Sequence, residues 1–326
     1  MNKNVSNIAV SIVCNAYNHE RYIRSALDGF VMQKTTFPFE VLVHDDASTD
    51  GTAGIIREFE MKYPEIIKPI YETENQYSKR DGSLARIQYG RVKGKYIALC
   101  EGDDYWTDPL KLQKQFDALE ANPEVDICAT TANLEQDGKI VGKLEPSHEN
   151  TVFSAENVIL GGGGFVETAS LMYRARVRSY PEPFFRQLWL DYFVQIAGSL
   201  RGGMIYLAEA TCVYRLATAG SWNQRMLRDH KRMTQHNQSV CEVLRCLDES
   251  TAGKYHDVIL KKIQLNRFNE YLADCDYKAM CMPEYRHLLM ELPASKRLMV
   301  RIGSHAPQMT NMLRGMARRV KAIVKR

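Results

Sequence analysis

The sequence has no apolar run approaching the ~18 residues that a membrane-spanning helix needs. A short apolar patch at residues 8–13 lacks the basic flank and the small-residue cleavage site of a signal peptide. We therefore expect a cytoplasmic protein without a membrane span. The 326 residues suffice for one large domain and an extension, and the apolar and charged fractions are ordinary for a globular protein.

No Cys-x-x-Cys pair occurs among the eight cysteines, so neither a metal-binding ribbon nor a redox motif is indicated. Cys14, Cys100 and Cys128 fall inside strand-like runs, where a thiol packs as a small apolar group. We interpret the cysteines as reduced and mostly buried, which fits a cytosolic protein.

Acidic residues are missing from residues 295–326, which hold nine Lys or Arg. The formal net charge of the chain is +4, so the remainder carries about −5. The basic character is thus a property of the tail, and this argues against a general nucleic-acid binder. We expect no nucleic-acid partner.

Strand-like and helical patterns alternate through the first 130 residues. Short β-rich runs at 8–14, 39–44, 66–71, 96–100 and 125–131 are separated by segments with apolar residues at helical spacing. This order predicts an α/β fold with a mostly parallel central sheet flanked by helices. Further strands are expected at 168–173, 204–207 and 211–216, with a hairpin turn at Asp137-Gly138 and a helix at 186–200. After Trp222 the pattern is helical, so we divide the chain into a domain at 1–220 and a helical extension at 221–326.

Two acidic loops follow predicted strands. Glu101-Gly102-Asp103-Asp104 places three carboxylates within four residues, and a bound divalent cation would relieve their mutual repulsion. The second loop begins Asp45-Asp46 and ends at Asp50. An isolated acidic cluster is usually a solvated turn, and Asp50 is better explained as a helix N-cap. Two such loops at the carboxyl edge of one parallel sheet favour a ligand site.

A third polar loop, Asn15-Ala16-Tyr17-Asn18, belongs to the same predicted edge. Tyr17 could stack on a nucleobase, and a carboxylate of the second loop could accept the N–H groups of uracil or guanine. A diphosphate would complete the coordination of a cation at the first acidic loop.

With these motifs the sequence resembles a family 2 inverting glycosyltransferase of the GT-A fold, of the bacterial surface-polysaccharide type. The resemblance covers about residues 6–220. Asp45-Asp46-Ala47-Ser48-Thr49-Asp50-Gly51-Thr52 matches the family's Asp-Asp-x-Ser-x-Asp-x-Thr, and Glu101-Gly102-Asp103-Asp104 matches its Asp-x-Asp-Asp apart from the first residue. The following Tyr105-Trp106 and Asp108-Pro109-Leu110-Lys111 are typical of the polysaccharide branch.

The resemblance implies roles for individual residues. Asp103 would hold Mn²⁺ or Mg²⁺, which offsets charge on the leaving diphosphate. The residues implied in donor binding are Tyr17, Asn18, Asp45, Asp46, Arg80, Glu101, Asp104 and Arg215. Glu101 has one methylene more than the usual Asp, which puts direct metal ligation by this residue in doubt. The family's frequent histidine after the position of Arg215 is absent, and so is the Gln-x-x-Arg-Trp motif of processive synthases. Transfer of a single sugar is therefore expected.

Asp191 would be the catalytic base, since an inverting transfer needs a base that removes the acceptor's proton. It stands alone in Trp189-Leu190-Asp191-Tyr192-Phe193, where the family more often has a Glu-Asp pair. The common alternative is a carboxylate on the solvent face of a helix. An acidic residue in so apolar a run favours the functional interpretation.

Apolar residues of the tail repeat at helical spacing at 309–324, with basic residues on the opposite face. This segment, 307–326, could lie on the anionic inner face of the plasma membrane. Packing on its own domain or on a second subunit in a homo-oligomer explains the pattern equally well. A lipid-linked acceptor would favour the membrane.

The expected activity is transfer of one sugar from a nucleotide-diphosphate sugar, with UDP preferred, to a glycan or lipid-linked acceptor in surface polysaccharide synthesis. A nucleotidyltransferase should carry a glycine-rich basic loop after the first strand, and Asn15-Ala16-Tyr17-Asn18 lacks it. A catalytically inactive sugar-nucleotide or glycan-binding module shares most of these residues and stays open as the alternative.

Overall fold

The computed structural model describes residues 8–179, 191–216, 218 and 229–305. The chain divides into two compact units, Met1–Arg228 and Asp229–Arg326. The first turns of the helix predicted at 186–200, the domain boundary predicted at 220 and the amphipathic segment predicted at 307–326 all lie outside the described residues.

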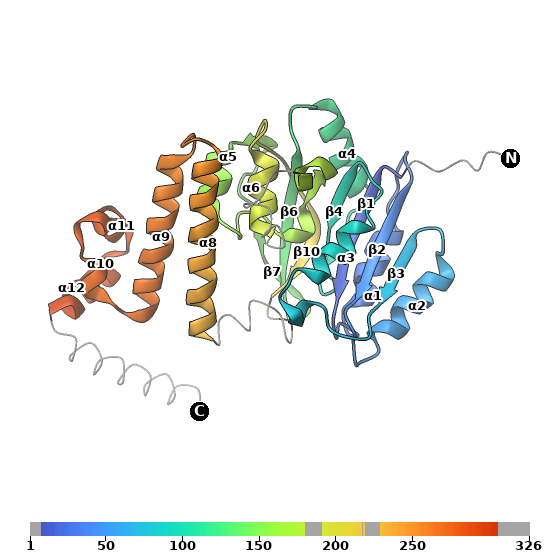
Figure 1. Cartoon of the computed structure of the whole chain (residues 1–326), viewed down its shortest axis with the longest axis horizontal. Coiled ribbons are helices and arrows are strands. Elements are labelled where there is room, and N and C mark those ends of the chain that lie inside the picture. The colour runs from blue at the N-terminus through green and yellow to red at the C-terminus, as the bar shows by residue number, and fades with distance from the viewer. Residues whose placement is uncertain (1–7, 180–190, 217, 219–228, 306–326) are drawn as a thin grey trace. The chain divides into compact units, whose positions relative to one another are not determined.

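The N-terminal unit is built on a sheet with the strand order β3-β2-β1-β4-β9-β6-β10-β5, in which β7 also pairs with β6 and β8 with β10 (Figure 1). The strands are β1 (Val10–Ala16), β2 (Phe39–Asp45), β3 (Ile67–Tyr71), β4 (Tyr96–Leu99), β5 (Tyr105–Trp106), β6 (Ile127–Gln136), β7 (Lys139–Leu144), β8 (Thr151–Phe153), β9 (Met172–Arg174) and β10 (Met204–Arg215). Strands β3, β2, β1 and β4 are parallel to one another, and β6 is parallel to β10, whereas β9 lies antiparallel between β4 and β6. The predicted α/β architecture is confirmed.

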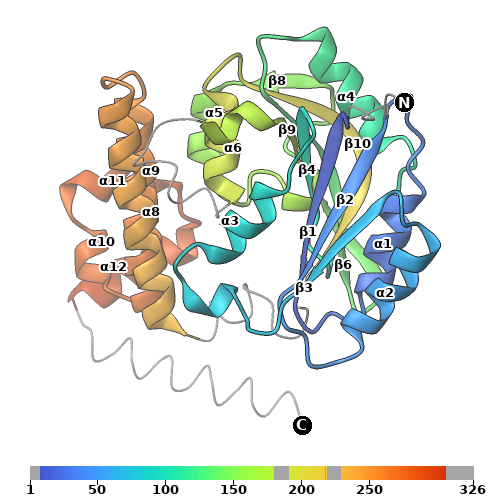
Figure 2. The same cartoon turned by 45° about the vertical axis from the view of Figure 1, so that its right-hand side comes forward.

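Helices cover both faces of this sheet. They are α1 (Ile23–Val31), α2 (Thr52–Lys62), α3 (Ser83–Gly90), α4 (Lys111–Ala121), α5 (Ala155–Gly161) and α6 (Asp191–Ser199), with the 3-10 turns η1 (Tyr77–Lys79), η2 (Thr168–Ser170) and η3 (Ala175–Ser179). Figure 2 shows α1 and α2 on one side of the sheet and α3 and α6 on the other. Alternate residues of β1, namely Val10, Ile12 and Cys14, join the core beneath α1, α2 and α4.

Two local predictions were wrong. The strands expected at 204–207 and 211–216 are one strand, β10, because register shifts between Leu207 and Cys212 absorb the intervening residues as an irregularity. The strand expected at 168–173 begins instead with η2, where the Ser170 hydroxyl and backbone N–H both donate to the carbonyl of Glu167. The hairpin is confirmed: Asp137 and Gly138 have φ of 50° and 76° and join β6 to β7.

Buried polar side chains tie the layers together. Gln88 on α3 donates through Nε2 to the carbonyls of Cys14 and Leu42, at 3.1 and 2.7 Å, and so links β1 to β2 from above. Lys111 on α4 is fully buried, donates to Gln115 at 2.5 Å and lies 4.4 Å from the Trp106 ring centroid. Burial lowers the pKa of Lys111 to about 8.

The C-terminal unit is helical, with α8 (His230–Ser250), α9 (His256–Asp274), α10 (Tyr277–Met280), α11 (Arg286–Glu291), α12 (Ala294–His305) and the 3-10 turn η5 (Pro283–Tyr285). Pro283 opens η5 and Pro293 separates α11 from α12. The unit has its own core around Phe268, Tyr277 and Met280. Within the part of the chain that the structure describes, no helix is both long and apolar enough to cross a bilayer.

The contact between α6 and β6 offers a test of the fold. A Cβ added at Gly198 would lie 2.6 Å from the Cβ of Ile127, so Gly198→Ala should lower the free energy of unfolding by about 1–3 kcal/mol. Gly54 on α2 has open space around it, and Gly54→Ala should be neutral or stabilising by up to about 1 kcal/mol. Urea unfolding midpoints measure both; equal effects would contradict this packing.

Candidate active site

Three polar loops meet at one edge of the sheet because they follow β1, β2 and β4, which are parallel neighbours. The backbone N–H of Asp46 donates to the carbonyl of Ala16, and the N–H of Gly102 donates to the carbonyl of Asn15, both at 2.9 Å. The loop after β1 is thus bonded to each acidic loop. The convergence expected from the strand order is confirmed at this edge.

Gly102 is required by the closeness of these loops. A Cβ at this position would lie 2.8 Å from Nδ1 of His19 and 3.1 Å from the carbonyl oxygen of Asn15. Any side chain would therefore push the acidic loop away from the loop after β1.

His19 lies between the two acidic loops, and the sequence interpretation missed it. Burial lowers its pKa, while the carboxylates of Asp103, Asp50 and Asp45 act in the opposite direction. Nδ1 of His19 is buried without a hydrogen-bond partner. Its place directly after Asn18 was the available clue.

Two further buried acceptors at this edge lack partners, Oδ1 of Asn15 and Oδ1 of Asp45. Burial raises the pKa of Asp45, and hydrogen bonds from Ser48 oppose this. A buried acceptor without a donor is costly, so a ligand that supplies N–H or O–H groups would be favoured here. Tyr17 is 45% exposed in the same loop, with a ring face accessible for stacking.

Asn18 and Asp46 have protein partners, which points to positioning rather than direct ligand contact. Oδ1 of Asn18 accepts the N–H of Thr49 at 2.8 Å, which joins the first and second loops. The carboxylate oxygens of Asp46 accept the backbone N–H groups of Gln76 and Tyr77, at 2.6 and 3.0 Å. Asp46 thus fixes the segment that carries η1.

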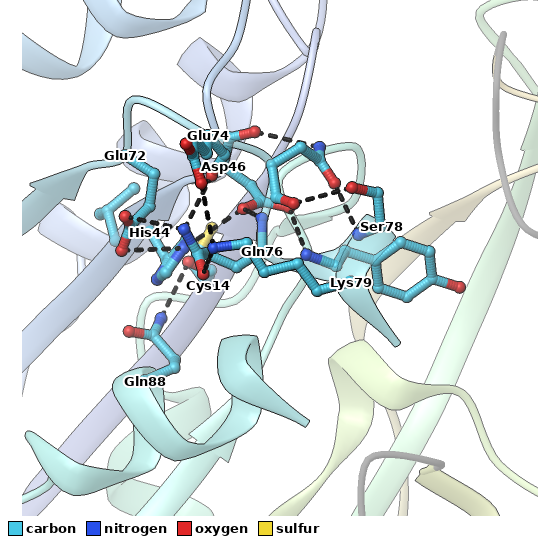
Figure 3. A network of polar contacts seen from close by, with 12 residues as sticks. Cys14, His44, Asp46, Glu72, Glu74, Gln76, Ser78, Lys79 and Gln88 are labelled. Carbon is cyan, nitrogen blue, oxygen red and sulfur yellow. Dashed lines mark hydrogen bonds and ion pairs between the residues drawn. The ribbon is translucent and has the colours of Figure 1, made fainter. Parts of the chain in front are cut away.

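A buried polar network supports Asp46 (Figure 3). His44 is fully buried, and its Nε2 lies 3.7 Å from Oδ1 of Asp46 and 3.8 Å from Oε1 of Glu72. Neither ring nitrogen of His44 has a hydrogen-bond partner. Burial lowers the pKa of His44, although both carboxylates favour its charged form. The imidazole is therefore neutral at pH 7.

The first acidic loop is anchored to the end of β10. Oδ1 of Asp104 accepts the backbone N–H of Arg215 at 2.9 Å, and Nη1 of Arg215 donates to the carbonyl of Asp103 at 2.7 Å. Nε of Arg215 pairs with Glu135 at 3.1 Å. Oδ2 of Asp103 accepts the hydroxyl of Thr218 at 2.8 Å. Arg215 thus braces the loop through its backbone and side chain.

Negative charge in this loop is poorly compensated. Burial raises the pKa of Asp104 well above its usual range, and the charge of Asp103 adds to the effect. Burial and Asp103 also raise the pKa of Glu101 to about 8, although Asn15 donates to it at 3.2 Å. Such crowding of desolvated carboxylates fits a site that a cation completes.

The donor set is compatible with a hard divalent metal. In the described ranges, no group of three or more His, Cys, Asp or Glu side chains is arranged to hold a metal ion. A cation would therefore be held by one or two carboxylates of this loop and by substrate phosphates, which is common for Mg²⁺ and Mn²⁺. The residues present fit this arrangement, and Asp103 stays the predicted ligand.

Asp191 begins α6 and lies beside a second carboxylate. Its Oδ2 accepts the hydroxyl of Thr168, and its charge acts on both Glu101 and Glu167. Burial, with the charge of Asp191 in addition, raises the pKa of Glu167 to about 7. Glu167, the residue directly before the η2 turn, thus adds a second carboxylate to the site.

Arg80 does not join the buried groups. It follows η1 in a left-handed conformation with φ of 54°, and its side chain is exposed. Its role in diphosphate binding stays a prediction.

Comparison with known proteins adds to this geometry. The family model of Glycosyl transferase family 2 matches residues 11–177. The chain belongs to glycosyl transferase family 2. In this family 2 protein the matched region includes the three polar loops and ends within η3, whereas Asp191, Arg215 and Thr218 follow it in the sequence.

Two relatives indicate its wider kinship. An uncharacterized protein of Mycobacterium tuberculosis, Rv1520, is 37% identical over 217 residues, which is 66% of this chain and 60% of the relative. The chain thus spans about three fifths of that relative's length. The Escherichia coli UDP-Glc:alpha-D-GlcNAc-diphosphoundecaprenol beta-1,3-glucosyltransferase WfaP is 30% identical over 133 residues, covering 41% of this chain and 49% of that protein.

Solved structures share the fold at low sequence identity. Staphylococcus aureus TarS 1–349 in complex with UDP-GlcNAc superimposes with a TM-score of 0.56 at 15% identity, covering 91% of this chain and 79% of TarS. The mannosyltransferase PcManGT from Pyrobaculum calidifontis, in complex with GDP-Man and Mn²⁺, gives 0.50 at 14% identity, covering 94% and 92%. These likenesses show that the family 2 protein has the GT-A fold.

Asp46 should hold the segment around η1 in place. Asp46→Asn removes the charge and one acceptor, so the amides of Gln76 and Tyr77 should exchange with solvent at least about 10-fold faster. Hydrogen exchange followed by mass spectrometry measures this. Asp81→Asn, at an exposed carboxylate nearby, is the control and should leave these amides unchanged. Unchanged exchange in Asp46→Asn would sink the anchoring role.

His44 should make the protein sensitive to mild acid. Its folded pKa is below the usual 6.5, so the unfolded state takes up the proton first. The contribution of neutral His44 to the free energy of unfolding is fully present above about pH 6.5, and it is lost as the pH falls towards the folded pKa. Urea midpoints at about pH 7.5 and about pH 5.5 should therefore differ less in His44→Gln than in the wild type. An identical difference in both proteins would contradict the assignment.

Proposed function

We propose that this family 2 protein is a metal-dependent inverting glycosyltransferase that moves one sugar from a nucleotide-diphosphate sugar to a glycan or lipid-linked acceptor. The observation that carries the proposal is the meeting of the three polar loops at one sheet edge, where Glu101 accepts a hydrogen bond from Asn15 and has its pKa raised by burial first, with the charges of Asp103 and Asp191 adding to the effect. The residue expected at the diphosphate and the residue expected at the acceptor hydroxyl therefore act on one site.

Asp191 is the proposed base. It would take the proton of the acceptor hydroxyl as that oxygen bonds to the anomeric carbon, and the bond from this carbon to the diphosphate oxygen breaks on the opposite side. The hydroxyl of Thr168 donates to Oδ2 of Asp191 and would fix the direction of the carboxylate. Glu167, with its pKa raised to about 7 by burial first and by Asp191 second, exchanges protons readily near neutrality.

Asp103 is the proposed ligand of Mn²⁺ or Mg²⁺, which when bound offsets charge that develops on the leaving diphosphate. PcManGT, a structural neighbour, was solved with Mn²⁺. Arg215 would maintain the position of Asp103 through the carbonyl that it binds. Asp104, which accepts the N–H of Arg215, has a similar bracing role.

The nucleoside would bind between Tyr17 and Asp45, where a stacking surface lies in the same loop system as an unpartnered buried acceptor. A UDP-sugar is the proposed donor, since WfaP is described as using UDP-Glc and TarS was solved with UDP-GlcNAc. WfaP is also described as acting on a diphosphoundecaprenol-linked sugar, which supports a lipid-linked acceptor in surface polysaccharide synthesis.

The basic tail at 307–326 is proposed to attach the protein peripherally to the anionic inner face of the plasma membrane, where such an acceptor resides. A homo-oligomer formed through this segment is the other use of its apolar face. Binding to anionic vesicles distinguishes the two.

An inactive sugar-nucleotide or glycan-binding module is the second candidate. It would need the nucleoside groups but neither the Thr168–Asp191 contact nor a neighbouring Glu167 with a pKa near neutrality. The presence of both favours the enzyme.

The base assignment predicts separate effects on binding and turnover. Asp191→Asn keeps the shape of the side chain but removes proton acceptance, so transfer should fall by at least about 100-fold. UDP-sugar affinity in the presence of Mn²⁺ should change less than about threefold, since Asp191 is assigned to the acceptor side. Nucleotide release and calorimetric titration measure the two effects, with Asp117→Asn on the exposed face of α4 as the control. A collapse of donor affinity would overturn the role.

A further inference from the structure

Arg178 on η3 is a cationic side chain that no part of the proposed transfer mechanism uses. Its guanidinium carbon lies 3.2 Å from the ring centroid of Tyr89 on α3, so the two planes are stacked. A stacked guanidinium has its face covered, while its N–H groups stay directed along the edge of the plane. The edge is the part of arginine that forms paired hydrogen bonds with phosphate or carboxylate oxygens.

One nitrogen of that edge has no acceptor among the residues that the structure describes. Nη1 of Arg178 is buried without a hydrogen-bond partner, and no carboxylate of the described residues forms an ion pair with Arg178. By contrast, Arg176 in the same turn pairs with Asp126. A buried guanidinium nitrogen without an acceptor is energetically unfavourable, so an oxyanion from outside the protein would be stabilised there.

The surrounding groups extend this arrangement toward the base. Tyr173 on β9 is fully buried, and its hydroxyl interacts with the side chains of Tyr89 and Arg178 without making a hydrogen bond of normal geometry. In the sheet, Tyr173 is registered with Ile97 and Ile127, whereas its neighbour Met172 belongs to the core beneath α1, α2 and α4. Tyr173 is therefore on the opposite face of the sheet, the face covered by α3.

The turn η3, which carries Arg178, packs against α6, the helix that begins at Asp191. Arg178, Tyr89 and Tyr173 thus lie close to the residue assigned to the acceptor hydroxyl. The donor diphosphate has its own assigned groups at Asp103, braced by Arg215. An anion near Asp191 is then best supplied by the acceptor.

We propose that Arg178, held flat by Tyr89 and assisted by the Tyr173 hydroxyl, is a phosphate-binding site for a sugar acceptor that is linked through a diphosphate. The inference rests on the proposed transferase function and specifies its acceptor class. A diphosphate on the acceptor sugar would meet Arg178 while a hydroxyl of the same sugar meets Asp191, because η3 and α6 pack against each other.

Calorimetric titration of farnesyl diphosphate into the full chain, with UDP and Mn²⁺ present, tests this without requiring turnover. The wild type should bind it, and Arg178→Gln should weaken binding about 10- to 100-fold, as expected for one lost charge-assisted hydrogen bond. Arg178→Lys keeps the charge but loses the planar fork, and it should give an intermediate loss. UDP affinity should be equal in all variants.

Arg176→Gln, two positions away, is the matched control and should bind farnesyl diphosphate like the wild type. If Arg178→Gln weakens UDP instead, the anion belongs to the donor and the acceptor site is refuted. Equal binding of both ligands by Arg178→Gln and wild type, or no binding of farnesyl diphosphate by the wild type, would leave only a structural stack. Should the wild type fail to bind UDP, the proposed donor is wrong, and the farnesyl diphosphate titration without UDP still decides the role of Arg178.

Discussion

The position of β1 between β2 and β4 is the constraint on which the site depends. Because these strands are parallel, their following loops leave the sheet at one edge, and two backbone hydrogen bonds, Asp46 to Ala16 and Gly102 to Asn15, hold the loops together. Neither bond involves a side chain. Acidic residues can therefore occupy both outer loops without changing the relative positions of the loops. The one requirement is that position 102 has no side chain.

A second physical theme is an unbalanced charge inside the protein. Glu101, Asp104 and Glu167 are desolvated next to other carboxylates, and Arg215, which braces the acidic loop, donates its side-chain hydrogen bonds to a carbonyl and to Glu135. The folded protein thus bears the unfavourable free energy of burying carboxylates close together, which a bound cation and substrate would reduce. Such an imbalance is typical of a site arranged for a ligand rather than for stability.

Sequence patterns predicted the alternating elements and the acidic loops well, because apolar periodicity and strand-end polarity are local properties. They could not predict that Asp46 would turn inward to the amides of Gln76 and Tyr77, since that contact joins segments 30 residues apart. His19 was overlooked as a site residue for a related reason: it is identified by burial against distant carboxylates and not by its neighbours in sequence. The bulged β10 was read as two strands because its irregular middle lacks alternation.

The contrast between two arginines shows how partners separate bracing from binding. The side chain of Arg215 donates to a carbonyl and to a carboxylate, and it lies 4.3 Å from the ring centroid of Tyr105 and 5.3 Å from that of Tyr22. The protein itself therefore supplies partners for this guanidinium. Arg178 has one ring and no acceptor for its buried nitrogen. Replacing Arg215 should disturb the loop that it supports, because its hydrogen bonds are made within the protein. Replacing Arg178 should disturb only the binding of a ligand, because its buried nitrogen has no acceptor in the protein. The unmet hydrogen bond, more than the charge, therefore marks Arg178 as a residue for an external oxyanion.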